Sequence, residues 1–191
     1  MSRTVDHQRR DRLLEAVTTD LVDNGLTGAS LDRLAAAADT SARMLVHHFS
    51  SRHQLIELAL ARARQRQLEA ARTALPSSPD FLSHLAVAWP WFISHQTRCY
   101  FKLFSQVASA ELSDGNETVR GGMAREWVDL LQSGFAAAGY SSAASRIYAT
   151  ILAAQLRGLF LDLDATGDTR RIAHAYQHFV GLLRANTPPL Q

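Results

Sequence analysis

The sequence is poor in several residue types, and each shortage narrows its class. It has one cysteine, Cys99, among 191 residues, so no disulfide can form within the chain. No run of about 18 apolar residues occurs, which predicts that no helix spans a membrane. The polar start, MSRTVDHQRRDR, lacks the apolar core of a secretory signal. We therefore expect a cytoplasmic protein that makes no membrane contact.

An excess of charge of one sign is also missing. The chain has 20 basic and 18 acidic residues, a formal net charge of +2, and its only lysine is Lys102. Seven arginines balance seven acidic residues up to Leu55. This charge balance excludes a polybasic protein that coats nucleic acid. Any DNA contact must come from where the charges are placed, because their total is too small.

What the chain does contain predicts helices. Only 5 prolines and 10 glycines interrupt it, and alanine, leucine and arginine, which favour helix, are abundant. No interior segment alternates β-branched and polar residues, so the expected fold class is all-α. The helical period and the breakers predict about nine helices, at 6–23, 31–38, 41–49, 52–75, 81–89, a stretch ending near 112, 117–138, 143–163 and 169–185.

The second and third of these helices have the spacing of a helix-turn-helix. Ser30 is placed to cap the first of the pair, and small residues such as Ala35 and Ala38 permit close helix packing. Leu45 and Phe49 are placed to hold the second helix against the domain. Its outward face must then carry the groups that contact DNA, and the residues available there are Thr40, Ser41, Ala42, Arg43, Met44 and His47.

The segment GLTGASLDRLAAAADTSARMLVHHFSSRHQL, residues 25–55, resembles the DNA-binding domain of tetracycline-repressor-like (TetR) transcriptional regulators. The matching positions are Leu34-Ala35, Ala38, Ser41, Leu45, His48-Phe49 and Arg52. The resemblance implies a helix-turn-helix domain at 1–52 and a ligand-binding and dimerisation domain at 53–191. It further implies a homodimer on a palindromic double-stranded operator, acting as a repressor that a small effector releases.

The same resemblance implies which residues contact DNA. Base readout would fall to Ala42, Arg43, Met44 and His47, with Arg43 foremost because a guanidinium can bond O6 and N7 of guanine together. The remaining contacts, mainly to phosphates, would come from Ser30, Arg33, Thr40, Ser41, His48 and Arg52. Three positions depart from the family pattern, in which a glycine usually stands at Asp39, a threonine or serine at Met44 and a tyrosine at Val46. A phosphate contact expected of that tyrosine is therefore missing.

The predicted helix 143–163 is apolar around more than one face, and the last predicted helix, 169–185, adds further apolar residues. One face can pack inside the subunit while another meets a partner copy, so we expect a four-helix dimer interface there. A monomeric core is the alternative interpretation of the same pattern.

Aromatic residues gather between Phe81 and Phe135, with a few polar residues among them. Apolar linings with sparse polar groups are typical of small-molecule sites, although the same rings can simply fill a core. The expected effector is largely apolar, aromatic or planar. The predicted ligand-binding residues are Trp89, Phe92, His95, Cys99, Phe101, Phe104, Met123, Trp127 and Gln155.

Two other classes stay open on the sequence. His174 and His178 share one helical face, as do His95 and Cys99, a spacing able to hold a metal in an all-α metalloprotein or enzyme. Neither pair has a third ligand nearby in the sequence, and the common catalytic and phosphate-binding motifs are absent. We therefore expect no catalytic residue, no metal and no cofactor. A helical interaction module that does not bind DNA is the second alternative.

Overall fold

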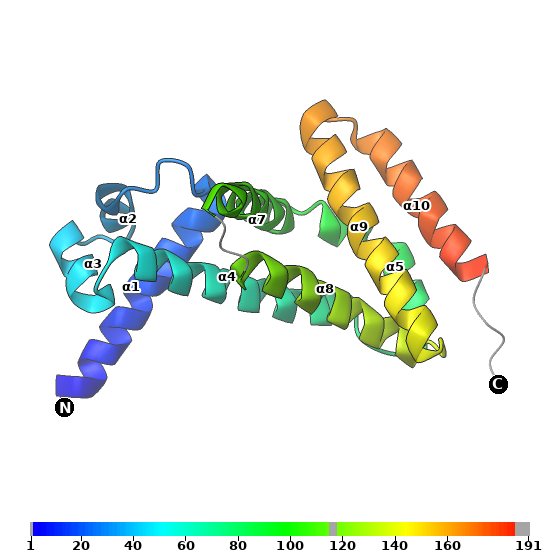
Figure 1. Cartoon of the computed structure of the whole chain (residues 1–191), viewed down its shortest axis with the longest axis horizontal. Helices are drawn as coiled ribbons and strands as arrows, with labels where there is room; N and C mark the ends of the chain where they lie inside the picture. Colours follow the sequence, from blue (N-terminus) through cyan, green and yellow to red (C-terminus); the bar gives the residue numbers. More distant parts are fainter. Residues whose placement is uncertain (1, 115–117, 186–191) are drawn as a thin grey trace. The chain divides into compact units, whose positions relative to one another are not determined.

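The computed structural model describes residues 2–114 and 118–185, and within them it leaves out the side chains of 2–5, 108–114, 118–121 and 123. This part of the chain forms ten helices and no strand, which confirms the all-α prediction (Figure 1). The helices are α1 Ser2–Asn24, α2 Leu31–Ala37, α3 Ala42–Phe49, α4 Arg52–Ala74, α5 Phe81–Val87, α6 Trp89–Phe92, α7 His95–Asp114, α8 Thr118–Ala137, α9 Ser142–Thr166 and α10 Thr169–Ala185.

The helix count differs from the prediction at Pro90. The sequence predicts one helix over 81–89, whereas the structure ends α5 at Val87 and begins the one-turn α6 at Trp89. Pro90 stands in the first turn of α6, where its missing N–H breaks no helical hydrogen bond. The extra short helix follows from this placement, and ten helices replace the nine expected.

The chain divides into two compact units, made of residues 1–67 with 102–115 and of residues 68–101 with 116–191. Both α4 and α7 contribute residues to each unit. The functional boundary expected after residue 52 stays a prediction, since it concerns DNA and ligand binding and not compactness.

The core of the first unit lies between α1 and the helices that follow it. Val17, Leu34, Leu45 and Leu55 are completely buried, and Phe49 is nearly so. Ion pairs add to this packing on the surface, where Arg62 of α4 lies 3.2 Å from Asp11 of α1 and Arg66 of α4 pairs with Glu15. The three helices of the helix-turn-helix region therefore rest on one continuous apolar base.

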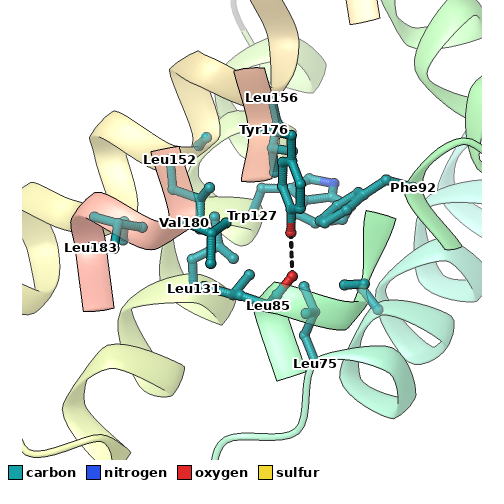
Figure 2. Packing of buried hydrophobic residues seen from close by; sticks show 14 of the residues in the cluster. Leu75, Leu85, Phe92, Trp127, Leu131, Leu152, Leu156, Tyr176, Val180 and Leu183 are labelled. Carbon is teal, nitrogen blue, oxygen red and sulfur yellow. Dashed lines mark hydrogen bonds between the residues drawn. The ribbon is translucent and has the colours of Figure 1, made fainter. Parts of the chain in front are cut away.

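The second unit is built around one large apolar cluster, which α8, α9 and α10 share with α5 and α6. α8 packs chiefly against α9, and α10 packs against both α5 and α9. Figure 2 shows Trp127, Phe92 and Tyr176 grouped beside the leucine and valine side chains of this cluster. Among the described residues, no helix is long and apolar enough to cross a membrane.

Candidate DNA-binding and effector sites

The turn between α2 and α3 is held by local hydrogen bonds. Ser30 and Ser41 occupy the N-cap positions of α2 and α3, and their hydroxyl oxygens accept from the N–H groups of Arg33 and Met44. The N–H of Thr40 donates to the carbonyl of Ala35 at 3.0 Å. These caps satisfy donors that a helix start leaves open, so the two short helices begin where the sequence predicted.

The inner face of α3 is fixed to the domain. Leu45 and Phe49 are buried, as expected, and the guanidinium of Arg10 lies 4.9 Å from the centre of the Phe49 ring. Arg10 also donates from Nε to the carbonyl oxygen of His48 at 3.3 Å. A long side chain from α1 therefore covers the ring and binds the backbone of α3, which limits how α3 can tilt.

The outer face of α3 carries the side chains predicted to contact bases. Arg43 and His47 are exposed, while Ala42 and Met44 are partly buried. Val46, where the family pattern has tyrosine, is 39% exposed. Within the described part of the chain Arg43 makes no ion pair, so its guanidinium keeps its donors for an external acceptor.

The residues predicted to contact phosphates differ in how far the protein itself already binds them. The hydroxyls of Ser30 and Ser41 accept a backbone bond and keep their own proton to donate. Arg52 uses Nε to bind the carbonyl of Ala29 at 2.7 Å. The exposed hydroxyls and the rest of the Arg52 guanidinium lie near the N-terminal ends of α2, α3 and α4.

Arg33 and His48 are engaged inside the domain. Arg33 pairs with Asp20 at 3.0 Å and donates to the carbonyl oxygens of Gly25 and Thr27. The side chain of His48 is only 5% exposed, with Nδ1 3.6 Å from a carboxylate oxygen of Asp6. The surroundings of both side chains indicate that they support the α1–α2 loop and α3.

Gln106 of α7 binds the same loop. Its Oε1 accepts a hydrogen bond from the N–H of Leu26 at 2.7 Å, and a Cβ placed on Gly25 would lie 2.6 Å from that oxygen. Gly25 has a φ of +75°, so both its conformation and its close neighbour call for glycine. The sequence offers no signal for this contact, because Gln106 lies 80 residues from Leu26.

The predicted effector residues do not all come together. Trp89, Phe92, Phe101 and Trp127 belong to the aromatic cluster of the second unit, whereas Phe104 is buried in the first unit. The side chain of Met123 lies outside the described residues.

Three predicted polar residues lie at or near the surface of the second unit. Gln155 is half-buried on α9, His95 is exposed, and Cys99 is half-buried one turn further along α7. The sulfur of Cys99 lies 3.6 Å from Nε2 of His95.

The rings of the second unit form an ordered set. Phe101 stacks on Phe160 with centroids 4.3 Å apart, and Trp89 stacks on Tyr176 at 4.9 Å. Trp127 contacts Phe101 at 5.4 Å. Phe160 and Tyr176 were not among the predicted effector residues, because they come from α9 and α10, which only the fold brings to the 81–135 region.

The polar atoms within this cluster are unequally satisfied. The hydroxyl of Tyr176 donates to the carbonyl oxygen of Leu85 at 2.6 Å, and burial raises the pKa of Tyr176 well above its usual value of 10.0 (Figure 2). Trp127 is 7% exposed, and its Nε1 is buried with no hydrogen-bond partner among the described residues. A buried N–H without an acceptor is uncommon in folded proteins.

Large apolar side chains are exposed on α9 and, at one position, on α10; we call this set the apolar strip. Its large members are Ile147, Ile151 and Leu161 on α9, with Leu182 on α10, and they are 45–74% exposed. The opposite faces of the two helices belong to the core, with Leu152, Leu156, Tyr176 and Val180 buried. The two-sided character predicted for these helices is therefore present.

His174 and His178 are both exposed on α10, one turn apart. No group of three ligand atoms that includes either of them occurs in the described part of the chain.

Comparison with known proteins gives partial likeness in sequence and broad likeness in structure. No family model matches the sequence. The transcriptional activator FasR of Mycolicibacterium smegmatis, an HTH-type protein, is 32% identical over 100 residues, which cover 51% of this chain and 46% of FasR. The chain thus matches about half the length of this curated relative.

Solved structures match over almost the whole chain. A Rhodococcus protein assigned to the TetR-family transcriptional regulators is 20% identical with a TM-score of 0.66, covering 95% of this chain and all of that one. The multidrug binding protein EbrR complexed with proflavin is 26% identical with a TM-score of 0.62, covering 92% of this chain and 99% of that one. The first of these neighbours is described as a transcriptional regulator and the second as a multidrug binding protein. The chain therefore has the all-α fold of the TetR-family structure that it matches.

Proposed function

We propose that the chain is a ligand-responsive transcriptional repressor that binds a palindromic operator as a homodimer and leaves it when a small, largely apolar effector binds. The observation that carries DNA binding is the two-sided character of α3. Leu45 and Phe49 anchor the helix on one side, while Arg43 and His47 face solvent on the other. The major groove of DNA admits an α-helix, and polar side chains on the outer face of that helix can then contact the base edges.

The residues at the helix starts support phosphate contact. Ser30 and Ser41 keep a free hydroxyl proton at the N-termini of α2 and α3, where backbone N–H groups also favour an anion. Arg52, at the start of α4, adds positive charge. In this account Arg33 and His48 act by holding the loop and α3 in place, while Thr40 contributes to phosphate contact and Met44 to base readout.

Dimerisation is proposed through α9 and α10. The exposed strip of Ile147, Ile151, Leu161 and Leu182 offers apolar area that a second copy can cover by an isologous contact. A dimer also explains palindromic recognition, because two recognition helices about 34–36 Å apart read successive turns of the major groove.

Effector binding is proposed at the aromatic cluster of the second unit. EbrR is described as a multidrug binding protein and was solved with proflavin, a planar aromatic compound. The rings of Trp127, Phe101 and Phe160 offer flat apolar surface for a ligand of that shape. Release from DNA then requires that the effector bind more tightly to the conformation that does not fit the operator.

Repression follows if the operator overlaps a promoter, because a bound dimer then excludes the polymerase. FasR is described as an activator, so the sign of regulation needs its own measurement. A reporter driven by the selected site gives it: repression predicts higher expression when the regulator is removed, whereas activation predicts lower expression.

Selection from random duplex DNA tests DNA binding itself. Purified protein should enrich a palindrome at low salt, and its affinity should fall steeply as salt rises, since phosphate contacts release counterions. If the folded protein enriches no sequence with or without a panel of planar aromatic compounds, the proposal fails and the helical interaction module becomes the better account.

A further inference from the structure

The cluster that we propose as the effector site contains a polar atom that the protein leaves unused. Nε1 of Trp127 is buried, and no acceptor among the described residues reaches it. The indole itself is 7% exposed and contacts Phe101 at 5.4 Å and Trp91 at 6.5 Å between ring centroids. Burying a donor without a partner costs free energy that an incoming acceptor recovers.

Two buried tyrosine hydroxyls of the cluster are already bound. Tyr176 donates to the carbonyl oxygen of Leu85 at 2.6 Å, and Tyr140 donates to that of Leu183 at 3.2 Å. The N–H of Trp127 is a buried donor of the cluster that has no partner among the described residues, so it can serve a ligand at these rings. Because indole nitrogen donates and does not accept, the ligand must bring the acceptor.

The character of the cluster sets two further requirements. Its buried members are apolar and aromatic side chains, which fit a ligand that is largely apolar and neutral. Its rings lie in stacked or tilted pairs, such as Phe101 on Phe160 at 4.3 Å, which favours a flat ligand that can join the stack. Phe101 and Trp91 are only partly buried, so they are the rings through which a ligand could enter by a change of rotamer.

We propose that the N–H of Trp127 is the polar anchor of the effector site and donates a hydrogen bond to an acceptor on a neutral, planar aromatic ligand. The ligand class is a heteroaromatic or aromatic carbonyl compound, as distinct from a hydrocarbon. This inference rests on the proposed function, which assigns the aromatic cluster as the effector site. The binding step itself does not depend on DNA.

A matched pair of probes tests the anchor. Quinoline has a ring nitrogen that accepts a hydrogen bond and is neutral at pH 7.5, while naphthalene has the same shape without the acceptor. The chain has three tryptophans, so its ¹⁵N-labelled form gives three indole signals, and the Trp127→Phe variant identifies one of them. Quinoline should move the Trp127 indole proton downfield in the full-length protein, and naphthalene should not.

Affinities give the second readout. Quinoline should bind wild type about five-fold or more tightly than naphthalene, which is the net effect of one hydrogen bond, and Trp127→Phe should bring the ratio to about one. Tyr148→Phe is the matched control, because it removes a polar group from a ring that packs on the same cluster beside Phe135, and it should keep the ratio. Circular dichroism of each variant shows whether it folds. If Trp127→Phe does not fold, the effect of quinoline on the indole signals of the wild type still tests the anchor.

The possible failures are distinct. An unchanged ratio in Trp127→Phe, or no saturable quinoline binding up to about 5 mM, where a fragment of this size should occupy a fitting site, overturns the anchor. Quinoline that binds at Trp127 without releasing the protein from its selected DNA leaves the anchor intact and removes the effector role from the proposed function.

Discussion

Gln106 of α7 accepts a hydrogen bond from the backbone N–H of Leu26, with 2.7 Å between the side-chain oxygen and the nitrogen. The contact joins residues 80 positions apart in the chain, and it lies directly over Gly25, where an added Cβ would come within 2.6 Å of the same oxygen. The α1–α2 loop is thereby fixed by a side chain from α7, just before the helix-turn-helix begins.

Gln106→Leu should destabilise the protein and loosen this loop. The substitution keeps much of the volume but leaves the partly buried N–H of Leu26 without an acceptor, so the free energy of unfolding should fall by about 1–3 kcal/mol. Chemical denaturation measures this change. Gln106→Glu, which retains a side-chain oxygen as acceptor, should lose less. Equal stability of Gln106→Leu and wild type would mean that the contact contributes nothing.

Asp39→Gly should stabilise the protein. Asp39 has a φ of +47° in the turn between α2 and α3, a conformation that a Cβ disfavours and glycine adopts readily. We expect a gain of about 1 kcal/mol in the free energy of unfolding, with Asp39→Ala losing stability and Asp39→Asn close to wild type. Thermal unfolding of the three variants gives the order. A loss of stability in Asp39→Gly would contradict the strain argument.

Tyr176→Phe should lower stability at neutral pH and change its pH dependence. The variant leaves the buried carbonyl of Leu85 without its 2.6 Å donor, which should cost about 1–2 kcal/mol. Burial raises the pKa of Tyr176 in the folded state, whereas the unfolded chain ionises it near pH 10. The stabilisation is therefore complete below about pH 10 and is lost progressively as the pH rises further.

Denaturation of wild type and Tyr176→Phe between pH 8 and about pH 11 separates this contribution from those of other groups. Wild type should lose stability more steeply than the variant above about pH 10. Parallel curves would show that Tyr176 ionises equally in the folded and unfolded states.

The sequence was sufficient for features that depend on neighbouring residues. Gly25 ends α1 with positive φ, and Ser30 and Ser41 cap α2 and α3, all within a few positions of the helices concerned. Buried Leu45 and Phe49 followed from helical spacing alone. Local chemistry of this kind can be predicted because its partners lie within one turn.

Features that depend on distant segments could not be predicted in the same way. Gln106 reaches Leu26 only in the folded unit, and Phe104, expected near the effector rings, is buried in the first unit while Phe101 belongs to the second. Arg33 fits the pattern of a DNA contact, yet Asp20 and two loop carbonyls already bind it. A sequence motif gives the type of residue at each position but not the partners of that residue in the folded chain.

Ile151→Glu should convert the proposed dimer to a monomer. Ile151 is 45% exposed on α9 within the apolar strip, and a carboxylate there would be buried without a partner when two copies meet. Analytical ultracentrifugation should give a dimer for wild type and a monomer for the variant. Val87→Glu is the matched control, because Val87 is 74% exposed on α5, outside the strip. A monomeric wild type, or an Ile151→Glu variant that stays dimeric, would reject the proposed interface.

The most direct test of the central claim is selection from random duplex DNA by three proteins side by side: wild type, Arg43→Ala and Arg72→Ala. Arg72 is exposed in the last turn of α4, so its loss removes one positive charge away from α3. We predict a palindrome enriched by wild type and Arg72→Ala, with discrimination at one base pair of each half-site reduced by about 1–3 kcal/mol in Arg43→Ala. The same enriched site with the same base preferences for all three proteins would contradict base readout by Arg43 and, with it, the role assigned to the outer face of α3.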